Sequence, residues 1–410
     1  MASKRFAGGG RFPAAALLAF SLLTACGDDS FDDDGPATGK WQWTTLDGPD
    51  ASIPRLVSNH ETLVVVGTEL FLGTDDGVWQ RTLSGEDEWQ QAGLDGRSIS
   101  ALAVTSDGQR MIAAGFDPRD QAAATAWYST DAGRTWTAAA TWPKSEPGAP
   151  EGDIAYPILA LEPDPLDADV VYGNLDGDTL AVTVDGGSTW VMANGATSPT
   201  FGYACVPYRS ADASVLLQGC ELPLDVAWVG ARRVISADRF DLPDFRFVYG
   251  YPDIAELSNR RINAIVTAVG SKNSVYVGVE GGLVELTSKS GQWSTRADLE
   301  ANWLYLAEDG SADPYAYVRA IAVLDSGGDN VLFGGPLNDD NKEVLLFETA
   351  DRGKTVRQLA APAGLIDPRL EQALRLNAND VLLVVSQVDI GVPVDAPGAH
   401  RPKVYRLRRS

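Results

Sequence analysis

Residues 129–136 read Ser-Thr-Asp-Ala-Gly-Arg-Thr-Trp, and they are the most informative segment of the sequence about its architecture. It recurs at residues 183–190 as Thr-Val-Asp-Gly-Gly-Ser-Thr-Trp, and in a weaker form at residues 349–356 as Thr-Ala-Asp-Arg-Gly-Lys-Thr-Val. Glycine adopts a positive φ at little steric cost, and Ser, Thr and Asp side chains bond to nearby backbone amides. The pattern therefore predicts a tight turn between two strands, with the Trp ring buried between neighbouring sheets.

The shared pattern, (Ser/Thr)-x-Asp-x-Gly-x-Thr-Trp, resembles the Asp-box, or BNR repeat, of sialidase-like and sortilin-like β-propellers. A motif that repeats in several sheets is a construction element, whereas a catalytic residue is needed once. The resemblance therefore implies a structural role, in preference to the alternative that Asp131 and Asp185 are catalytic or bind calcium. The two complete copies supply these box residues: Ser129, Asp131, Gly133, Thr135, Trp136, Thr183, Asp185, Gly187, Thr189 and Trp190.

Strand patterns recur with a period of about 50 residues, as expected for a repeat architecture. One unit shows the order plainly, with strands predicted at Pro157–Leu161, Val170–Gly173 and Thr179–Thr183 before the box. We predict an all-β fold, a single β-propeller of seven four-stranded blades, with six or eight left open because two units are irregular. The segment Trp41–Leu46 resembles a fourth strand that the last unit lacks. We expect it to pair with Val404–Leu407 and close the ring.

The beginning of the chain has the pattern of a secretory signal peptide. Basic residues precede the apolar run Phe12–Leu23, which is shorter than the roughly 20 residues that a membrane-spanning helix needs. The run ends in Leu-Thr-Ala-Cys at residues 23–26, which resembles a bacterial lipobox. The resemblance implies cleavage after residue 25 and lipidation of Cys26. An ordinary cleavage site with a chance cysteine is the alternative.

Residues 26–39 combine the cysteine with a run of aspartates, glycine, proline and serine. Like charges and helix breakers prevent packing, so this segment is predicted to be a solvated tether. A calcium loop is the alternative, but the spacing of an EF-hand is absent. The residue after the cysteine is Gly27 and not aspartate, which by the sorting rule of bacterial lipoproteins favours the outer membrane of the cell envelope. The predicted domains are thus the signal peptide 1–25, the tether 26–39 and the propeller 40–410.

The chain is strongly acidic, with a formal net charge of −23. Removal of residues 1–25 takes away three positive charges and no negative one. This charge argues against nucleic acid and anionic membrane surfaces as partners, which leaves the lipid anchor as the attachment to the membrane. We expect a monomer that binds an envelope protein or glycan, and we predict no cofactor and no metal site.

Two further cysteines, Cys205 and Cys220, flank a turn-like segment at residues 210–213. In a hairpin centred near residue 212 they would face each other across adjacent strands. A disulfide is predicted for an oxidising compartment. A disulfide that closes a loop of this size stabilises the folded state by roughly 3 kcal/mol. Two free thiols in the core are the alternative.

Two segments that interrupt the repeat are rich in aromatic residues. Large rigid rings with polar edges can stack on sugars or grip a peptide. The alternative for residues 245–251 is an ordinary strand with core aromatics. The candidate ligand-binding residues are Tyr249, Tyr251, Trp303, Tyr305, Tyr315 and Tyr317.

Known catalytic patterns of this fold are weak here. Sialidases carry an Arg-Ile-Pro motif, whereas residues 53–55 read Ile-Pro-Arg. The chain has two histidines, neither in the context of a serine nucleophile. We therefore predict no catalytic residue and favour a non-catalytic, envelope-anchored binding or scaffold module. The alternative is a secreted glycoside hydrolase or lyase, which needs little more than a carboxylate pair in the propeller funnel.

Overall fold

The computed structural model describes residues 40–52, 62–84, 87–117, 120–142, 158–175, 179–194, 206–209, 216–219, 227–229, 234–236, 239–241, 246–248, 262–267, 271, 273–279, 281–290, 299–306, 318–335, 345–360, 362, 365, 369–388 and 400–410. All of them belong to one unit, Asp34–Ser410. The predicted signal peptide and tether lie outside the described residues. The same is true of these predicted site residues: Cys26, Cys205, Cys220, Tyr249, Tyr251, Tyr315 and Tyr317.

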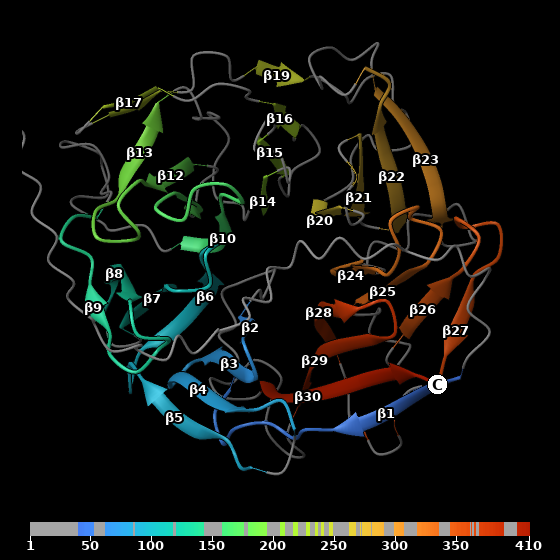
Figure 1. Cartoon of the computed structure of the whole chain (residues 1–410), viewed down its shortest axis with the longest axis horizontal. Helices are drawn as coiled ribbons and strands as arrows, with labels where there is room; N and C mark the ends of the chain where they lie inside the picture. The colour runs from blue at the N-terminus through green and yellow to red at the C-terminus, as the bar shows by residue number, and fades with distance from the viewer. Residues whose placement is uncertain are drawn as a thin grey trace, which may run out of the picture. The chain divides into compact units, whose positions relative to one another are not determined.

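In the described residues, six sheets form the blades of a β-propeller around a common axis (Figure 1). Each blade has four consecutive antiparallel strands; five of the sheets stop there, and the sheet of blade 3 has two further strands. Blade 1 contains β2 (Leu63–Val66), β3 (Glu69–Thr74), β4 (Gly77–Thr82) and β5 (Gln90–Gly93). Blade 2 contains β6 (Ser98–Val104), β7 (Met111–Asp117), β8 (Asp120–Ser129) and β9 (Thr137–Ala138). Blade 3 contains β10 (Ile158–Pro163), β11 (Val171–Leu175), β12 (Thr179–Thr183) and β13 (Val191–Asn194).

The second half of the chain forms the other three blades. Blade 4 contains β20 (Ile262–Thr267), β21 (Ser274–Val279), β22 (Gly282–Ser288) and β23 (Leu299–Leu306). Blade 5 contains β24 (Ala320–Val323), β25 (Val331–Gly335), β26 (Leu345–Thr349) and β27 (Arg357–Leu359). Blade 6 contains β28 (Arg369–Asn377), β29 (Asp380–Val388), β30 (His400–Arg409) and, from the other end of the chain, β1 (Trp41–Thr45).

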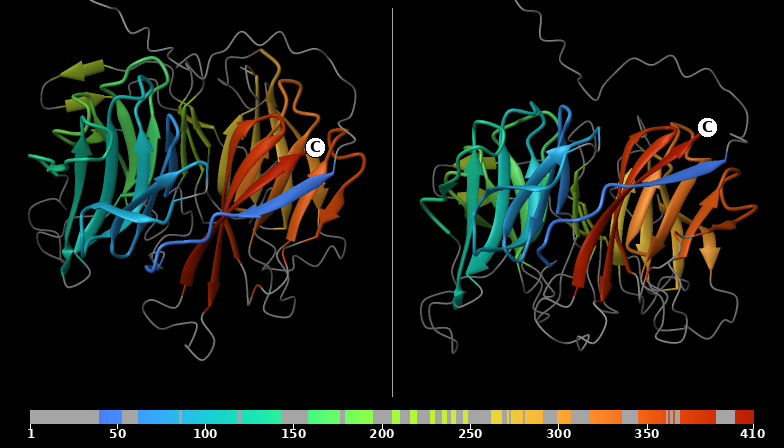
Figure 2. Two further views of the ribbon diagram at one scale, coloured as in Figure 1. Left: turned by 60° about the horizontal axis from the view of Figure 1, so that its bottom comes forward. Right: turned by 90° about the horizontal axis from the view of Figure 1, so that it is seen from below.

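The first strand of each blade lies innermost and contacts the first strand of a neighbouring blade. Thus β2 contacts β6, β6 contacts β10, β20 contacts β24, β24 contacts β28, and β28 returns to β2. Figure 2 shows the blades side by side from two further directions. The inner strand β6 is buried along six of its seven residues, as the unbroken apolar runs predict for strands covered on both faces.

The predicted closure of the ring by the N-terminal strand is confirmed. Strand β1 pairs antiparallel with β30, with Trp41 opposite Arg409 and Thr45 opposite Tyr405. The ladder continues beyond β1, where the Leu46 amide donates to the Val404 carbonyl at 2.8 Å. Chain ends far apart in sequence therefore complete one sheet, which leaves fewer unpaired strand edges. None of the sheets in the described residues closes on itself.

The predicted count of seven four-stranded blades is wrong: the described residues form six. Between blades 3 and 4, β14 (Val206–Arg209) pairs with β15 (Leu216–Gly219), and β16 (Ala227–Val229) pairs with β19 (Arg246–Val248), as separate two-stranded sheets. The remaining strands β17 (Val234–Ser236) and β18 (Arg239–Asp241) join blade 3, where β18 pairs parallel with β13. Strand patterns are local, but which strands pair depends on contacts elsewhere in the fold, so the repeat alone overcounted the blades.

The core lies between adjacent blades. At the junction of blades 6 and 1, fully buried side chains include Leu63, Leu70, Leu382 and Val404. Burying one such aliphatic side chain contributes roughly 1.5–3 kcal/mol relative to exposure. Such clusters pack the sheets of adjacent blades against one another. In the part of the chain that the structure describes, no helix has the length and apolar character to cross a membrane.

Candidate functional site

The three turns that contain the repeated motif share one hydrogen-bond pattern. In the first, Ser129 Oγ donates to Asp131 Oδ1 at 2.8 Å and accepts from the Gly133 amide at 2.8 Å. The Thr135 amide and hydroxyl donate to the two Asp131 oxygens at 2.8 and 2.7 Å. Hydrogen bonds from Thr135 and Ser129 lower the pKa of Asp131 to about 2. We call residues 129–136, 183–190 and 349–356 the box turns.

The other two box turns repeat this arrangement. Thr183 and Asp185 bond to Gly187 and Thr189 with distances from 2.7 to 2.9 Å. In the third turn, hydrogen bonds from the amide and hydroxyl of Thr355 lower the pKa of Asp351. Both carboxylate oxygens of each aspartate therefore accept hydrogen bonds inside their own turn.

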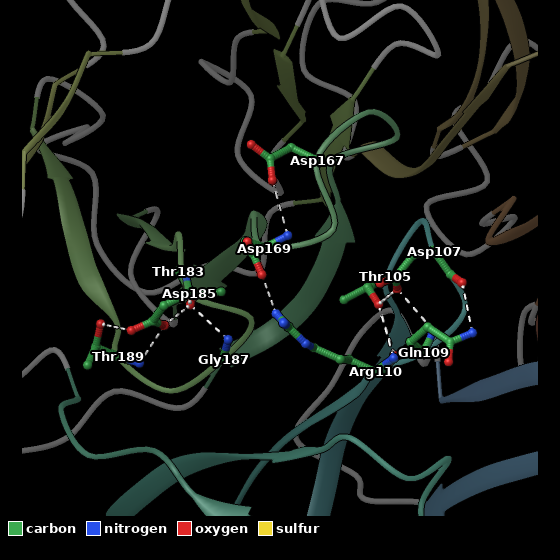
Figure 3. A network of polar contacts seen from close by, with 10 residues as sticks. All are labelled: Thr105, Asp107, Gln109, Arg110, Asp167, Asp169, Thr183, Asp185, Gly187 and Thr189. Atoms are coloured by element: carbon green, nitrogen blue, oxygen red, sulfur yellow. Dashed lines mark hydrogen bonds and ion pairs between the residues drawn. The ribbon is translucent and has the colours of Figure 1, made fainter. Parts of the chain in front are cut away.

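Each box turn also contacts the preceding blade. In Figure 3, Arg110 of blade 2 reaches Asp169 of blade 3, beside the box residues Thr183, Asp185, Gly187 and Thr189. In the third turn, Arg352 Nη2 donates to Glu285 Oε1 of blade 4 at 3.0 Å.

The Trp136 ring of the first turn covers Gly93, and its Nε1 donates to the Ala92 carbonyl at 3.2 Å. Trp190 is 2% exposed and packs against Trp142 at 6.0 Å between ring centroids.

Strand β23 carries the two predicted ligand-binding aromatics that the structure describes. Tyr305 packs at the junction of blades 4 and 5, with ring centroids 5.4 Å from Phe333 and 4.9 Å from Phe347. The Trp303 ring lies beside Gly282, where an added Cβ would come within 2.7 Å of it. In the pairing of β23 with β22, Tyr305 lies opposite Leu283 and Trp303 lies opposite Val284. A register shift therefore lies between the two aromatic residues. Tyr305 is thus part of an aromatic cluster with two phenylalanines of the next blade.

A cavity of about 430 Å³ lies at the seam between blade 6 and blade 1. On one side it is formed by residues 47–50, which follow β1 and lie against β30. An added Cβ on Gly48 would come within 1.8 Å of the Pro402 carbonyl oxygen, so only glycine allows this close approach. The other side is formed by β4 and the residues before β5. We call this cavity the seam pocket; its lining residues are Asp47, Gly48, Pro49, Asp50, Trp79, Arg81, Asp87, Glu88 and Trp89.

Arg81 fixes the base of the seam pocket. Its side chain is buried, at 6% exposure, and its Nη1 donates to the Leu46 carbonyl. Its guanidinium lies over the Trp89 ring, 5.6 Å from the centroid, and Trp89 Nε1 donates to the same Leu46 carbonyl at 3.2 Å. Burial lowers the pKa of Arg81, while Asp47 and Asp87 oppose that shift. The base is therefore held in place by the backbone that leaves the closing strand.

Two buried donors at the seam pocket lack acceptors. Neither Arg81 Nε nor Trp79 Nε1 has a hydrogen-bond partner. Buried donors without acceptors cost about 1–3 kcal/mol each, and both atoms are shielded from solvent. Four carboxylates line the same cavity, of which Asp50 pairs with Arg401. The pocket thus combines two indole rings, a buried guanidinium and an acidic rim.

Sequence reasoning missed the seam pocket. Trp79 and Arg81 are two positions apart on β4, which places their side chains on one face of the strand. That spacing, followed by Asp-Glu-Trp at residues 87–89, was the available signal. The contribution of residues 47–50 could not be inferred, because it depends on how the closing strand passes into blade 1.

Buried carboxylates elsewhere in the described residues take part in cross-blade or cross-strand pairs. Glu348 is 1% exposed and bonds to Arg357, Arg409 and Trp41. The others pair as follows: Glu285 with Arg352, Glu371 with Ser386 and Arg319, Asp380 with Arg406 and Arg408, and Asp164 with Tyr172. Among the described residues, no group of three or more His, Cys, Asp or Glu side chains is arranged to hold a metal ion.

No protein-family model matches the sequence, and no curated protein matches it either. Solved structures are similar in fold. The GH74 xyloglucanase from Xanthomonas campestris has a TM-score of 0.58 at 14% identity, over 88% of this chain and 55% of that one. The GH74 enzyme from Niastella koreensis has a TM-score of 0.57 at 14% identity, over 85% of this chain and 54% of that one.

YCF48 from Cyanidioschyzon merolae has a TM-score of 0.52 at 13% identity, over 89% of this chain and 98% of that one. The chain thus spans about half the length of the GH74 enzymes and nearly all of YCF48. At these identities the likeness concerns the fold, and it supports the β-propeller architecture described above.

Proposed function

We propose that this protein is a lipid-anchored, non-catalytic Asp-box propeller that binds a protein or glycan in the bacterial envelope. The observation that carries the proposal is how its carboxylates are used. Each carboxylate that the structure describes as buried is bonded to a basic, hydroxyl or indole group of the framework. A glycoside hydrolase needs a pair of carboxyl groups facing a substrate, one of them protonated.

The aspartates of the box turns support the same assignment. Asp131 and Asp351 have lowered pKa values because they accept hydrogen bonds from their own turns. A general acid needs the opposite shift, so that it holds a proton near neutral pH. Asp75 does have a raised pKa, caused by burial, but its Oδ1 accepts from the Ser52 amide at 2.8 Å. That bond anchors the chain after the closing strand to blade 1.

The solved relatives in fold include both kinds of protein. One of them is YCF48 bound to D1 peptide, which aligns with 92% of this chain at a TM-score of 0.51 and 12% identity. Others are the GH74 enzymes. The alignment with YCF48 spans nearly all of both chains, which favours the binding role over the glycoside hydrolase alternative.

The anchor can be tested in cells by metabolic labelling with a palmitate analogue. The full-length protein is expected to take up label and to remain with the membrane fraction. After density separation of the membranes, the protein is expected to be enriched in the outer-membrane fraction. A Cys26→Ser variant removes the sulfur that the lipid would modify and is expected to stay unlabelled. Equal labelling of both proteins would contradict the proposed lipidation.

The binding role can be tested with the purified full-length protein in detergent. We expect capture of a reproducible partner from solubilised envelopes, and no hydrolysis of polysaccharides in a broad panel. The double variant Tyr249→Ala, Trp303→Ala tests the aromatic candidates from the sequence. If the variant captures the same partners as the wild type, these residues are not part of the binding site. Products released from any polysaccharide would favour the hydrolase alternative.

A further inference from the structure

We propose that the seam pocket binds an uncharged sugar residue of an envelope glycan. This inference rests on the proposed binding function and names its ligand class and its location. The site lies between the closing strand and blade 1, where residues 47–50 face Trp79, Arg81 and Trp89. Its volume of about 430 Å³ is within the usual range for small-ligand pockets.

The lining chemistry matches the two kinds of surface that a sugar ring presents. A pyranose has apolar C–H faces, which stack on flat aromatic rings, and a rim of hydroxyl groups, which both donate and accept hydrogen bonds. Trp79 and Trp89 supply the aromatic surface. The carboxylates of Asp87 and Glu88 accept from hydroxyl groups, because ionised carboxylates are acceptors only.

The charges of the lining distinguish a sugar from a charged ligand. A lysine or arginine side chain would meet the guanidinium of Arg81 at the base of the cavity. An anionic group would supply acceptors, but it would meet the carboxylates of Asp47, Asp87 and Glu88 in the same cavity. Hydroxyl groups satisfy both sets of lining groups without adding charge.

The base of the pocket is organised before any ligand binds. Arg81 is held by the Leu46 carbonyl and by the face of Trp89, and Trp89 is held by the same carbonyl. Asp47 has a φ of +53°, a left-handed conformation. Its backbone amide donates to Thr45 Oγ1 at 3.0 Å, and this bond restricts the conformation of the turn. Fixed lining groups lower the entropic cost of binding.

Isothermal titration calorimetry on the full-length protein in detergent tests the proposal with defined probes. The neutral probes are cellotetraose, xylotetraose, mannotetraose and N-acetylchitotetraose; the charged probes are tetragalacturonate and tetralysine. We expect at least one neutral probe to bind, and the charged probes to bind at least tenfold more weakly. Quenching of tryptophan fluorescence by the same probe gives a second readout of stacking.

Variants locate the site. Trp79→Ala removes an aromatic wall, and Glu88→Gln keeps the shape of its side chain while removing the charge. Each variant is expected to bind the neutral probe at least tenfold more weakly than the wild type. Asp95→Asn, on an exposed turn outside the pocket, is the charge-matched control and should leave binding unchanged. Circular dichroism checks the fold of each variant, and Glu88→Gln remains informative if Trp79→Ala does not fold.

The outcomes separate this inference from the proposed function. Binding of tetralysine without any neutral probe would overturn the sugar assignment in favour of a basic peptide. Binding of a neutral probe that neither pocket variant weakens would place the site elsewhere on the propeller. If no probe binds while envelope capture still yields a partner, the seam-pocket inference fails and the proposed binding function stands.

Discussion

Trp41 Nε1 donates to Glu348 Oε1 at 3.0 Å, although 307 residues separate the two in sequence. Trp41 begins the closing strand of blade 6, and Glu348 lies on β26 of blade 5. The same carboxylate pairs with Arg409, whose guanidinium stacks on the Trp41 ring at 4.4 Å from the centroid. Burial lowers the pKa of Arg409, and the charge of Glu348 opposes that shift. One buried carboxylate therefore joins both ends of the chain to the neighbouring blade.

Removing this carboxylate should destabilise the closure strongly. Glu348→Ala leaves the buried Arg409 without its partner, and breaking a buried pair in this way typically costs about 3–5 kcal/mol. Trp41→Phe keeps a smaller aromatic ring at this position and removes the hydrogen bond of the indole, so it should cost less, about 0.5–1.5 kcal/mol for the hydrogen bond. Urea unfolding measures both values. Equal losses for the two variants would contradict the central role of the carboxylate.

The glycine of the third box turn should not tolerate a side chain. Gly353 has a φ of +80°, and an added Cβ would lie 2.6 Å from the backbone of Leu304 in blade 4. Gly67 is the matched control, because its φ is +61° and an added Cβ would meet nothing within 4 Å. Gly67→Ala should cost about 1 kcal/mol for the left-handed backbone alone. Gly353→Ala should lower the free energy of unfolding by clearly more, because the added Cβ also collides with blade 4. Thermal melting compares the two variants. Similar melting temperatures would mean that the third box turn can move away from blade 4 at little cost.

The first box turn should resist acid. The pKa of Asp131 is lowered to about 2 from its ordinary value of 3.8, chiefly by the Thr135 hydroxyl. A group with a lowered folded-state pKa contributes its full stability above pH 3.8 and loses it as the pH falls through about 2. Thr135→Ala removes the hydroxyl bond and keeps the amide bond, so the pKa of Asp131 should rise partway. Carboxyl-carbon NMR titration checks this; an unchanged value would show that the backbone amide alone sets the shift.

The predicted disulfide remains open to a direct test. Strand β14 pairs with β15 with Val206 opposite Gly219, which confirms the hairpin between the two cysteines but not the bond itself. Mass spectrometry of the non-reduced protein should find a peptide that links Cys205 and Cys220. The double variant Cys205→Ser, Cys220→Ser should lose roughly 3 kcal/mol if the bond forms. Two free thiols in the oxidised protein would favour the alternative.

The box turns could be predicted because their determinants are local, and the closing strand because the repeat leaves one strand position of the last unit empty. Asp131 and Thr135 are close enough in sequence to bond within a single turn, and the alternation of Trp41–Thr45 with polar residues is typical of an edge strand. A strand without a partner in its own unit, at the start of a chain whose last unit lacks one, points to closure. The physical reason is that hydrogen bonds within a turn join residues that are close in sequence and therefore depend little on the rest of the fold.

The blade count and the seam pocket were decided by tertiary structure. Strand β18 pairs with β13 of the preceding blade, and residue patterns contain no information about that choice between partners. The pocket brings Asp47 next to Trp79 and Glu88 only because β1 leaves blade 6 and crosses to blade 1. Tyr305 packs on Phe333 and Phe347 for the same reason: the register of one blade against the next determines which face of a strand is covered. Local residue patterns thus specify the turns and the repeating sheet, whereas packing between blades specifies how many blades form and where the seam pocket lies.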